Sequence, residues 1–272
     1  MPSTATVYRW ELRKLVSQKR TYLGLAFAIA MPLLFVLALT LRRHGAGPDV
    51  AFGRYVRQSG LAIPLVLLVF GSFWLFPLIT ALVAGDIVAA EDHNGTLKTI
   101  LTRSVGRGRV FAAKALATFT YAGLALVVMG LVAVAAGGLK SGLHPLTTLS
   151  GTRVSVGRAF VLMGASALVY MLPLLAIASI GLLLSTVTRN SAGAVVGTLL
   201  FSLLLQLVTI LPGLGGLRPY LLPEQFNAWQ GFLRVPTDWA PIGHAAWVCA
   251  IYAVVCVSAA FLVFLRRDVA GD

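Results

Sequence analysis

Six long apolar segments determine what this chain can fold into. Each has about 20 residues or more, the length that a helix needs to cross ~30 Å of hydrocarbon. They cover residues 22–41, 61–84, 111–136, 159–185, 192–211 and 242–265. Only 11% of the 272 residues are charged, whereas a soluble domain has about 25%. The sequence therefore predicts an all-α polytopic membrane protein with six transmembrane helices, because the segments lack the polar alternation of a β-barrel.

The segment before the first span, residues 4–20, has the pattern of an amphipathic helix that lies on a membrane surface. At about 100° per residue, one arc is expected to be apolar. Its members are Ala5, Tyr8, Leu12, Leu15 and Val16. The residues expected to face head groups or a partner are Arg9, Trp10, Arg13 and Lys14. An ordinary juxtamembrane anchor would show the same pattern and remains an alternative.

The basic residues predict the orientation. The net charge is +13, which in a membrane chain indicates contact with anionic lipid head groups and no nucleic-acid partner. An even number of spans places both termini on one side, and 13 of the 22 lysines and arginines lie on that side. The positive-inside rule therefore predicts a multi-pass protein of the cell (inner) membrane with both termini cytoplasmic.

The sequence lacks the motifs of an energy source. It has no GxxxxGK[ST] phosphate loop, no HExxH and no cluster of histidines and cysteines, so neither a catalytic nor a metal site is predicted. The nine acids lie at a terminus, in a loop or at the edge of a span, whereas ion-coupled transporters commonly keep an ionisable group near mid-membrane. Uphill transport would need another subunit. A membrane-embedded enzyme acting on lipid head groups stays open, with Asp86, Glu91, Asp92 and His93 as its polar group.

A polar stretch, EDHNGTLKTIL, interrupts the apolar chain at residues 91–101. Leu97, Ile100 and Leu101 follow the i, i+3, i+4 spacing of one helix face, and basic residues flank that face. Residues 91–104 are therefore predicted to form a short cytoplasmic helix with an apolar stripe, a shape that fits the cleft of a soluble partner.

At these residues the chain resembles the membrane permease subunits of type-2 ABC exporters. The matching positions are Asp86, Glu91, Gly95-Thr96-Leu97, Leu101, Ser104-Val105-Gly106-Arg107 and Lys114, and the tail Phe264-Leu265-Arg266-Arg267-Asp268 is also similar. The usual Pro-Val-Ser-Arg turn of that family reads Ser-Val-Gly-Arg here. Lys114 is expected at head-group level, where the third span begins.

The resemblance implies a permease that pairs with a second copy or a paralogue and is driven by two separate cytoplasmic ATPase subunits, which would bind ATP and Mg. These subunits would dock on residues 91–104 and on the surface helix. The coupling residues would be Glu91, Gly95, Thr96, Leu97, Lys98, Ile100, Leu101, Arg103 and Arg107. The substrate pathway would be lined by Phe70, Phe73, Trp74, Val195, Leu199 and Leu203, although packing or lipid contact explains any one of them equally well. This apolar lining favours an amphiphilic or hydrophobic cargo such as a lipid, a peptide or an antibiotic-like molecule. A non-transporting scaffold of the same fold is the remaining alternative.

The long connection at residues 212–241 is rich in leucine and aromatic residues. It is expected to be an outer loop with an amphipathic piece at the interface, or a re-entrant hairpin. The alternative is a plain loop whose tryptophans belong to an aromatic belt.

Overall fold

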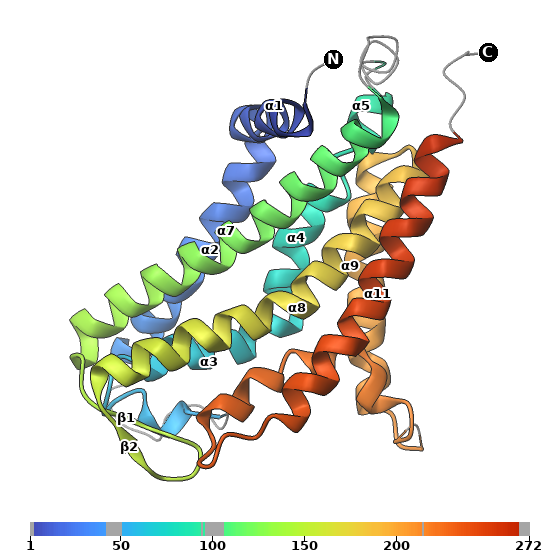
Figure 1. Cartoon of the computed structure of the whole chain (residues 1–272). Coiled ribbons are helices and arrows are strands. Elements are labelled where there is room, and N and C mark those ends of the chain that lie inside the picture. Colours follow the sequence, from blue (N-terminus) through green and yellow to red (C-terminus); the bar gives the residue numbers. More distant parts are fainter. Residues whose placement is uncertain (1–2, 42–50, 94, 96–105, 214, 267–272) are drawn as a thin grey trace.

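The computed structural model describes residues 3–41, 51–93, 95, 106–213 and 215–266, and these form a bundle of long helices (Figure 1). Within these described residues, six helices have the length and composition to cross a membrane. They are α2 (Lys19–Leu41), the combined helix Ala62–His93, α7 (Arg107–Ser141), α8 (Val156–Thr188), α9 (Ser191–Ile210) and α11 (Ala240–Leu265). The protein is thus an α-helical polytopic membrane protein, as the apolar segments predict.

The short helix α1 (Thr4–Ser17) lies across one end of the bundle, the same end as α5 (Ala89–His93) and the last turn of α11 (Figure 1). This end is called the α1 end below. A two-stranded antiparallel hairpin, β1 (Leu146–Thr147) with β2 (Arg153–Val154), lies at the opposite, hairpin end, where it joins α7 to α8. Strands of two residues leave no periodic pattern, so a purely helical chain was the expectation from the sequence.

The second span is interrupted by a π-helical turn, Gly71–Leu75, between α3 (Ala62–Phe70) and α4 (Phe76–Ala84). Two prolines, Pro64 and Pro77, flank this turn. Pro64 lies in the first turn of α3, where backbone N–H groups have no intrahelical acceptor and proline is tolerated. Pro77 follows the π turn, and a proline ring crowds the carbonyl group four residues earlier, which here belongs to Phe73 within that turn. The break therefore falls one turn before Pro77, as a π-bulge.

The core is centred on α8, which packs against α4, α7, α9 and α11. Its Tyr170 is fully buried and donates its hydroxyl proton to the Leu68 carbonyl oxygen at 2.9 Å. The ring meets Phe76 and Phe226 edge-on, with centroids 5.3 and 4.9 Å apart. A buried hydroxyl with a partner is what a phenol requires in an apolar interior.

The connection between α9 and α11 folds back against the bundle. It contains η3 (Arg218–Tyr220), α10 (Leu222–Gln225) and η4 (Ala228–Leu233), and α10 contacts α8, α9 and α11. Trp229 is fully buried and stacks on Phe52 of the loop that holds η1 (Gly53–Tyr55), with centroids 6.1 Å apart. The idea of an aromatic belt is therefore wrong for Trp229, although Trp239 is exposed.

Two glycines allow α7 to touch the loop before α3. A Cβ added at Gly137 would lie 2.5 Å from the Gly60 carbonyl oxygen, whereas a Cβ added at Gly130 of the same helix meets nothing within 4 Å. We expect Gly137→Ala to lower the free energy of unfolding by about 1–3 kcal/mol, because backbone must move to admit the methyl group. Gly130→Ala is expected to be neutral or to stabilise by about 0.5–1 kcal/mol. Denaturant unfolding of the purified chain in detergent measures both, and equal effects would contradict the close contact.

Candidate functional site

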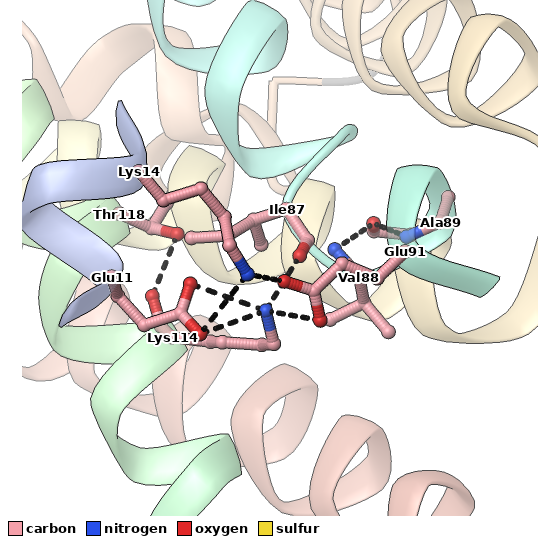
Figure 2. Close-up of polar contacts among 9 residues, drawn as sticks. Glu11, Lys14, Ile87, Val88, Ala89, Glu91, Lys114 and Thr118 are labelled. Carbon is pink, nitrogen blue, oxygen red and sulfur yellow. Dashed lines mark hydrogen bonds and ion pairs between the residues drawn. The ribbon is translucent and has the colours of Figure 1, made fainter. Parts of the chain in front are cut away.

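Four charged side chains meet inside the α1 end and form an ion cluster: Glu11 and Lys14 of α1, Glu91 of α5 and Lys114 of α7 (Figure 2). Lys114 Nζ lies 3.1 Å from Glu11 Oε1 and 2.7 Å from Glu91 Oε2. Lys14 Nζ contacts Glu91 Oε1 directly and lies 3.8 Å from Glu11 Oε1. Three elements that are distant in the sequence are thus joined by one set of ion pairs.

The cluster is buried and balanced in charge. The side chain of Lys114 is 0% exposed, and those of Glu11 and Glu91 are 6% and 8% exposed. An ammonium group has three donors, and that of Lys114 reaches both carboxylates and the Ile87 carbonyl oxygen, the last at 3.1 Å. Two anions face two cations, which is the arrangement that makes buried charge tolerable.

Lys14 is the member of the cluster nearest to solvent. Its side chain is 39% exposed. Burial acts to lower the pKa of Lys14, but the attraction of Glu91 and Glu11 outweighs it and holds that pKa above its ordinary value. The ammonium group is therefore charged at neutral pH and continues to bind both acids.

The spacing of the buried residues in α1 explains why Glu11 points toward the interior. Val7, Glu11 and Leu15 are its buried residues and recur every four positions, so they lie on one face. The apolar arc inferred from the sequence was displaced from this face, since Ala5 and Val16 are exposed. Glu11 lies between Val7 and Leu15 on this buried face, and that position was the one sequence signal for the ion cluster. The arc inferred from apolar residues alone did not include Glu11.

The sequence singles out Lys114 as a motif position at the start of a span near residue 111. In the structure α7 begins at Arg107, about one turn before residue 111, and Lys114 is fully buried. Its buried acidic partners were not predicted, because a lysine near the end of an apolar run looks the same in sequence whether it meets lipid phosphates or buried acids.

Other polar contacts hold the two chain segments that flank residues 94–105. The segment that ends at residue 93 is called the first stem below, and the segment that begins at residue 106 is called the second stem. The backbone N–H groups of Val88 and Ala89 donate to Ser185 Oγ of α8, at 3.1 and 3.0 Å (Figure 2). On the second stem, Arg107 donates to the Leu265 carbonyl oxygen of α11 at 2.7 Å. The stems are thus tied to α8 and α11 as well as to α1.

A further ionic contact lies beside the first stem. Arg20, at the start of α2, binds Asp86 and the hydroxyl group of Ser191, which also binds Asp86. Asp92 lies 3.8 Å from Arg189 as an ion pair. Every described acid of the α1 end therefore has a basic partner. In the described residues, no group of three or more metal-ligating side chains gathers.

The structure describes only part of the predicted coupling segment. Glu91 is buried within the ion cluster, and Arg107 is bound to α11. Gly95 is exposed and has a φ of 67°, a left-handed conformation that glycine adopts without strain. The rest lie outside the described residues: Thr96, Leu97, Lys98, Ile100, Leu101 and Arg103.

The predicted surface residues of α1 divide into two groups. Arg9, Trp10 and Arg13 are exposed, with Trp10 at 52%. Lys14, in contrast, reaches into the ion cluster. The exposed group forms a basic and aromatic face that suits lipid head groups or an acidic protein surface.

The candidate pathway residues are distributed over the second and fifth spans. Phe73 and Trp74 of the π turn and Leu203 of α9 are exposed. Phe70, Val195 and Leu199 are half-buried. The two spans touch closely, since a Cβ added at Gly85 would lie 2.7 Å from Val195 N. The structure thus places these residues on adjoining helices, three of them on the outer surface.

A family model described as "Protein of unknown function (DUF2705)" matches residues 33–270. Among curated proteins, none matches the chain.

Proposed function

The chain belongs to the family described as protein of unknown function, DUF2705, and we propose that it is the membrane permease subunit of an ATP-driven, type-2 ABC exporter. Two cytoplasmic ATPase subunits, which bind ATP and Mg, would dock at the α1 end. A second copy or a paralogue would complete the permease, and the α1 end with both termini would face the cytoplasm of the cell (inner) membrane.

The observation that carries the proposal is the attachment of the stems of residues 94–105. A soluble motor can move membrane helices only if the segment that it pushes is rigidly attached to those helices. Here one stem is joined to α1 and α7 by the ion cluster, and the other is joined to α11 through Arg107. A push on residues 94–105 would therefore be transmitted directly to α4, α7 and α11.

The same network joins the two surfaces on which a motor would dock. Lys14 bridges from α1 to Glu91, the first residue of the predicted coupling segment 91–104. The exposed face of α1, with Arg9, Trp10 and Arg13, and residues 94–105 would then move as one unit. Such a link suits a subunit that receives force from a partner better than it suits an anchor alone.

The cargo proposed is amphiphilic or hydrophobic. Phe73, Trp74 and Leu203 present apolar side chains on the surface of adjoining spans, where a second permease would enclose them. Large exposed aromatics at a helix break are a suitable lining for an apolar molecule, and the π turn offers a place where the second span can change shape.

A membrane-embedded enzyme is disfavoured by the pairing of its required acids. Asp86 binds Arg20, Glu91 binds two lysines, and Asp92 pairs with Arg189. General acid–base catalysis needs a carboxyl group that can reach substrate and exchange a proton. Carboxylates engaged by cations within the protein are better suited to holding helices together.

The test uses the chain purified from its native membranes together with the ATPase that accompanies it. Replacing Leu97 or Leu101 by aspartate places a charge in the predicted apolar stripe. We expect a loss of at least tenfold in copurifying Mg-dependent ATP hydrolysis, since a buried charge at an interface costs several kcal/mol.

The matched control is Leu139→Asp, which puts the same charge at a 92% exposed leucine near the hairpin end. It should keep both the ATPase and its activity. If the Leu97 and Leu101 variants also keep them, the coupling role is wrong. Flux of cargo into vesicles by the chain alone, without nucleotide, would contradict the whole proposal, and an ATPase complex without any flux would favour a scaffold.

A further inference from the structure

A cavity of about 610 Å³ lies at the hairpin end, between the folded-back connection and the start of α11. This volume is in the range of sites for small ligands. Its charged and polar lining residues are Arg218, Glu224, Gln225, Asn227, Gln230, Arg234 and His244. It is separate from the ion cluster, which lies at the α1 end (Figure 1).

Two guanidinium groups and one carboxylate line this cavity. Arg218 Nε binds Glu224, and Arg234 lies 3.3 Å from Asp238 Oδ2. A guanidinium group carries five N–H donors, and these contacts engage only one nitrogen of each group. The other N–H groups of each guanidinium group are charged donors, and arginine is the residue best matched to phosphate and carboxylate.

The wall between the charged groups is held in place by hydrogen bonds. The buried Gln225 donates its amide protons to the carbonyl oxygens of Pro219 and Leu221, at 2.6 and 3.0 Å. His244 of α11 binds the Pro219 oxygen through Nε2 at 2.8 Å. These contacts tie the connection to α11, so the cavity has a built frame.

An exposed apolar track continues from the cavity along α11. His244, Trp247, Ile251 and Val254 are spaced by three or four residues and so share one helix face. Trp247, Ile251 and Val254 are 45%, 53% and 64% exposed. An amphiphile whose hydrocarbon chain lies on this face would place its head group at the cavity.

We propose that this cavity binds the anionic head group, a phosphate or a carboxylate, of an amphiphile whose hydrocarbon tail lies along α11. Arg218 and Arg234 bind the head group, and Glu224 competes with it for Arg218. Such a molecule is either a resident bilayer lipid or a transported cargo. Binding at this site requires no ATPase, so the binding proposal can be tested independently of the proposed function.

The experiment titrates dihexanoyl phosphatidic acid into the purified chain in a neutral maltoside detergent, with dihexanoyl phosphatidylcholine and inorganic phosphate as comparisons. We expect the phosphatidic acid to bind at least tenfold more tightly than either. Arg218→Gln and Arg234→Gln should weaken its binding about tenfold, which corresponds to about 1.4 kcal/mol. Glu224→Gln should tighten binding, because it frees Arg218.

Arg153→Gln is the matched control, because Arg153 is an exposed arginine of β2 at the same end of the molecule but outside the cavity. It should leave binding unchanged. An equal loss in Arg153→Gln would show general attraction to a basic surface and overturn the proposal. Weaker binding by Glu224→Gln would indicate a cation site and also overturn it. Misfolding cannot imitate the expected pattern, since two variants change affinity in opposite directions.

A second arm separates the two sources of the ligand when the accompanying ATPase is present. Stimulation of ATP hydrolysis by phosphatidic acid, lost in Arg218→Gln, identifies a cargo. Binding without stimulation identifies a resident lipid. Either result supports the cavity as the site, and inorganic phosphate that binds as tightly as the lipid would exclude the tail contact along α11.

Discussion

Replacing Lys114 by methionine is expected to lower the free energy of unfolding by about 3–5 kcal/mol, the range for breaking a buried ion pair from one side. Methionine fills the space of the lysine stem but cannot neutralise an acid. Glu11 and Glu91, both almost fully buried, would then share the single ammonium group of Lys14. Denaturant unfolding in detergent, followed by tryptophan fluorescence, measures the loss.

Two companion variants test this explanation. Lys140→Met removes an exposed lysine near the other end of α7 and should change stability by less than about 0.5 kcal/mol. Removing Glu11 together with Lys114, as Glu11→Gln with Lys114→Met, restores one anion for one cation. The pair should recover a large part of the stability lost by Lys114→Met alone. Simple addition of the two single losses would contradict a shared cluster.

Replacing Trp229 by alanine is expected to cost about 3–5 kcal/mol, the range for removing a large buried aromatic side chain. The indole is fully buried and stacks on Phe52, so its loss leaves a cavity where the folded-back connection meets the loop before α3. Trp229→Phe should be far milder. The indole Nε1 of Trp229 has no hydrogen-bond partner among the described residues, so phenylalanine removes no bond and relieves one unsatisfied donor.

Trp239→Ala is the control, because Trp239 is 65% exposed in the same connection. Its loss should change stability by less than about 0.5 kcal/mol. Thermal unfolding midpoints of the three variants rank the effects. A Trp239→Ala loss as large as that of Trp229→Ala would mean that the connection is stabilised by its surface and not by its buried contact with Phe52.

The long helices could be predicted from the sequence because a long apolar run indicates a helix surrounded by lipid or by other apolar side chains. The residues at which these helices begin and end could not be predicted. The third span was predicted at residues 111–136, yet α7 extends from Arg107 to Ser141. Its first turn is basic, and a hydropathy criterion excludes such residues, although Arg107 is held there by a hydrogen bond to α11. A contact of that kind has no local signature.

The polar interior of the α1 end was not predictable for the same reason. Glu11 and Lys114 are 103 positions apart, and Lys14 and Glu91 are 77 apart. Helical spacing relates residues three or four positions apart, so it cannot bring these charges together. Glu91 and Lys114 were singled out for their places in a motif, and only the folded chain shows that they bind each other.

The ion cluster also bears on the order in which the chain can assemble. Glu11 leaves the ribosome before Lys114, which neutralises it and is made 103 residues later. Until α7 has been made, the buried face of α1 lacks the cation that pairs with Glu11. We therefore expect α1 to pack into the bundle only after α7, and a chain cut short before Lys114 should leave α1 open to proteases.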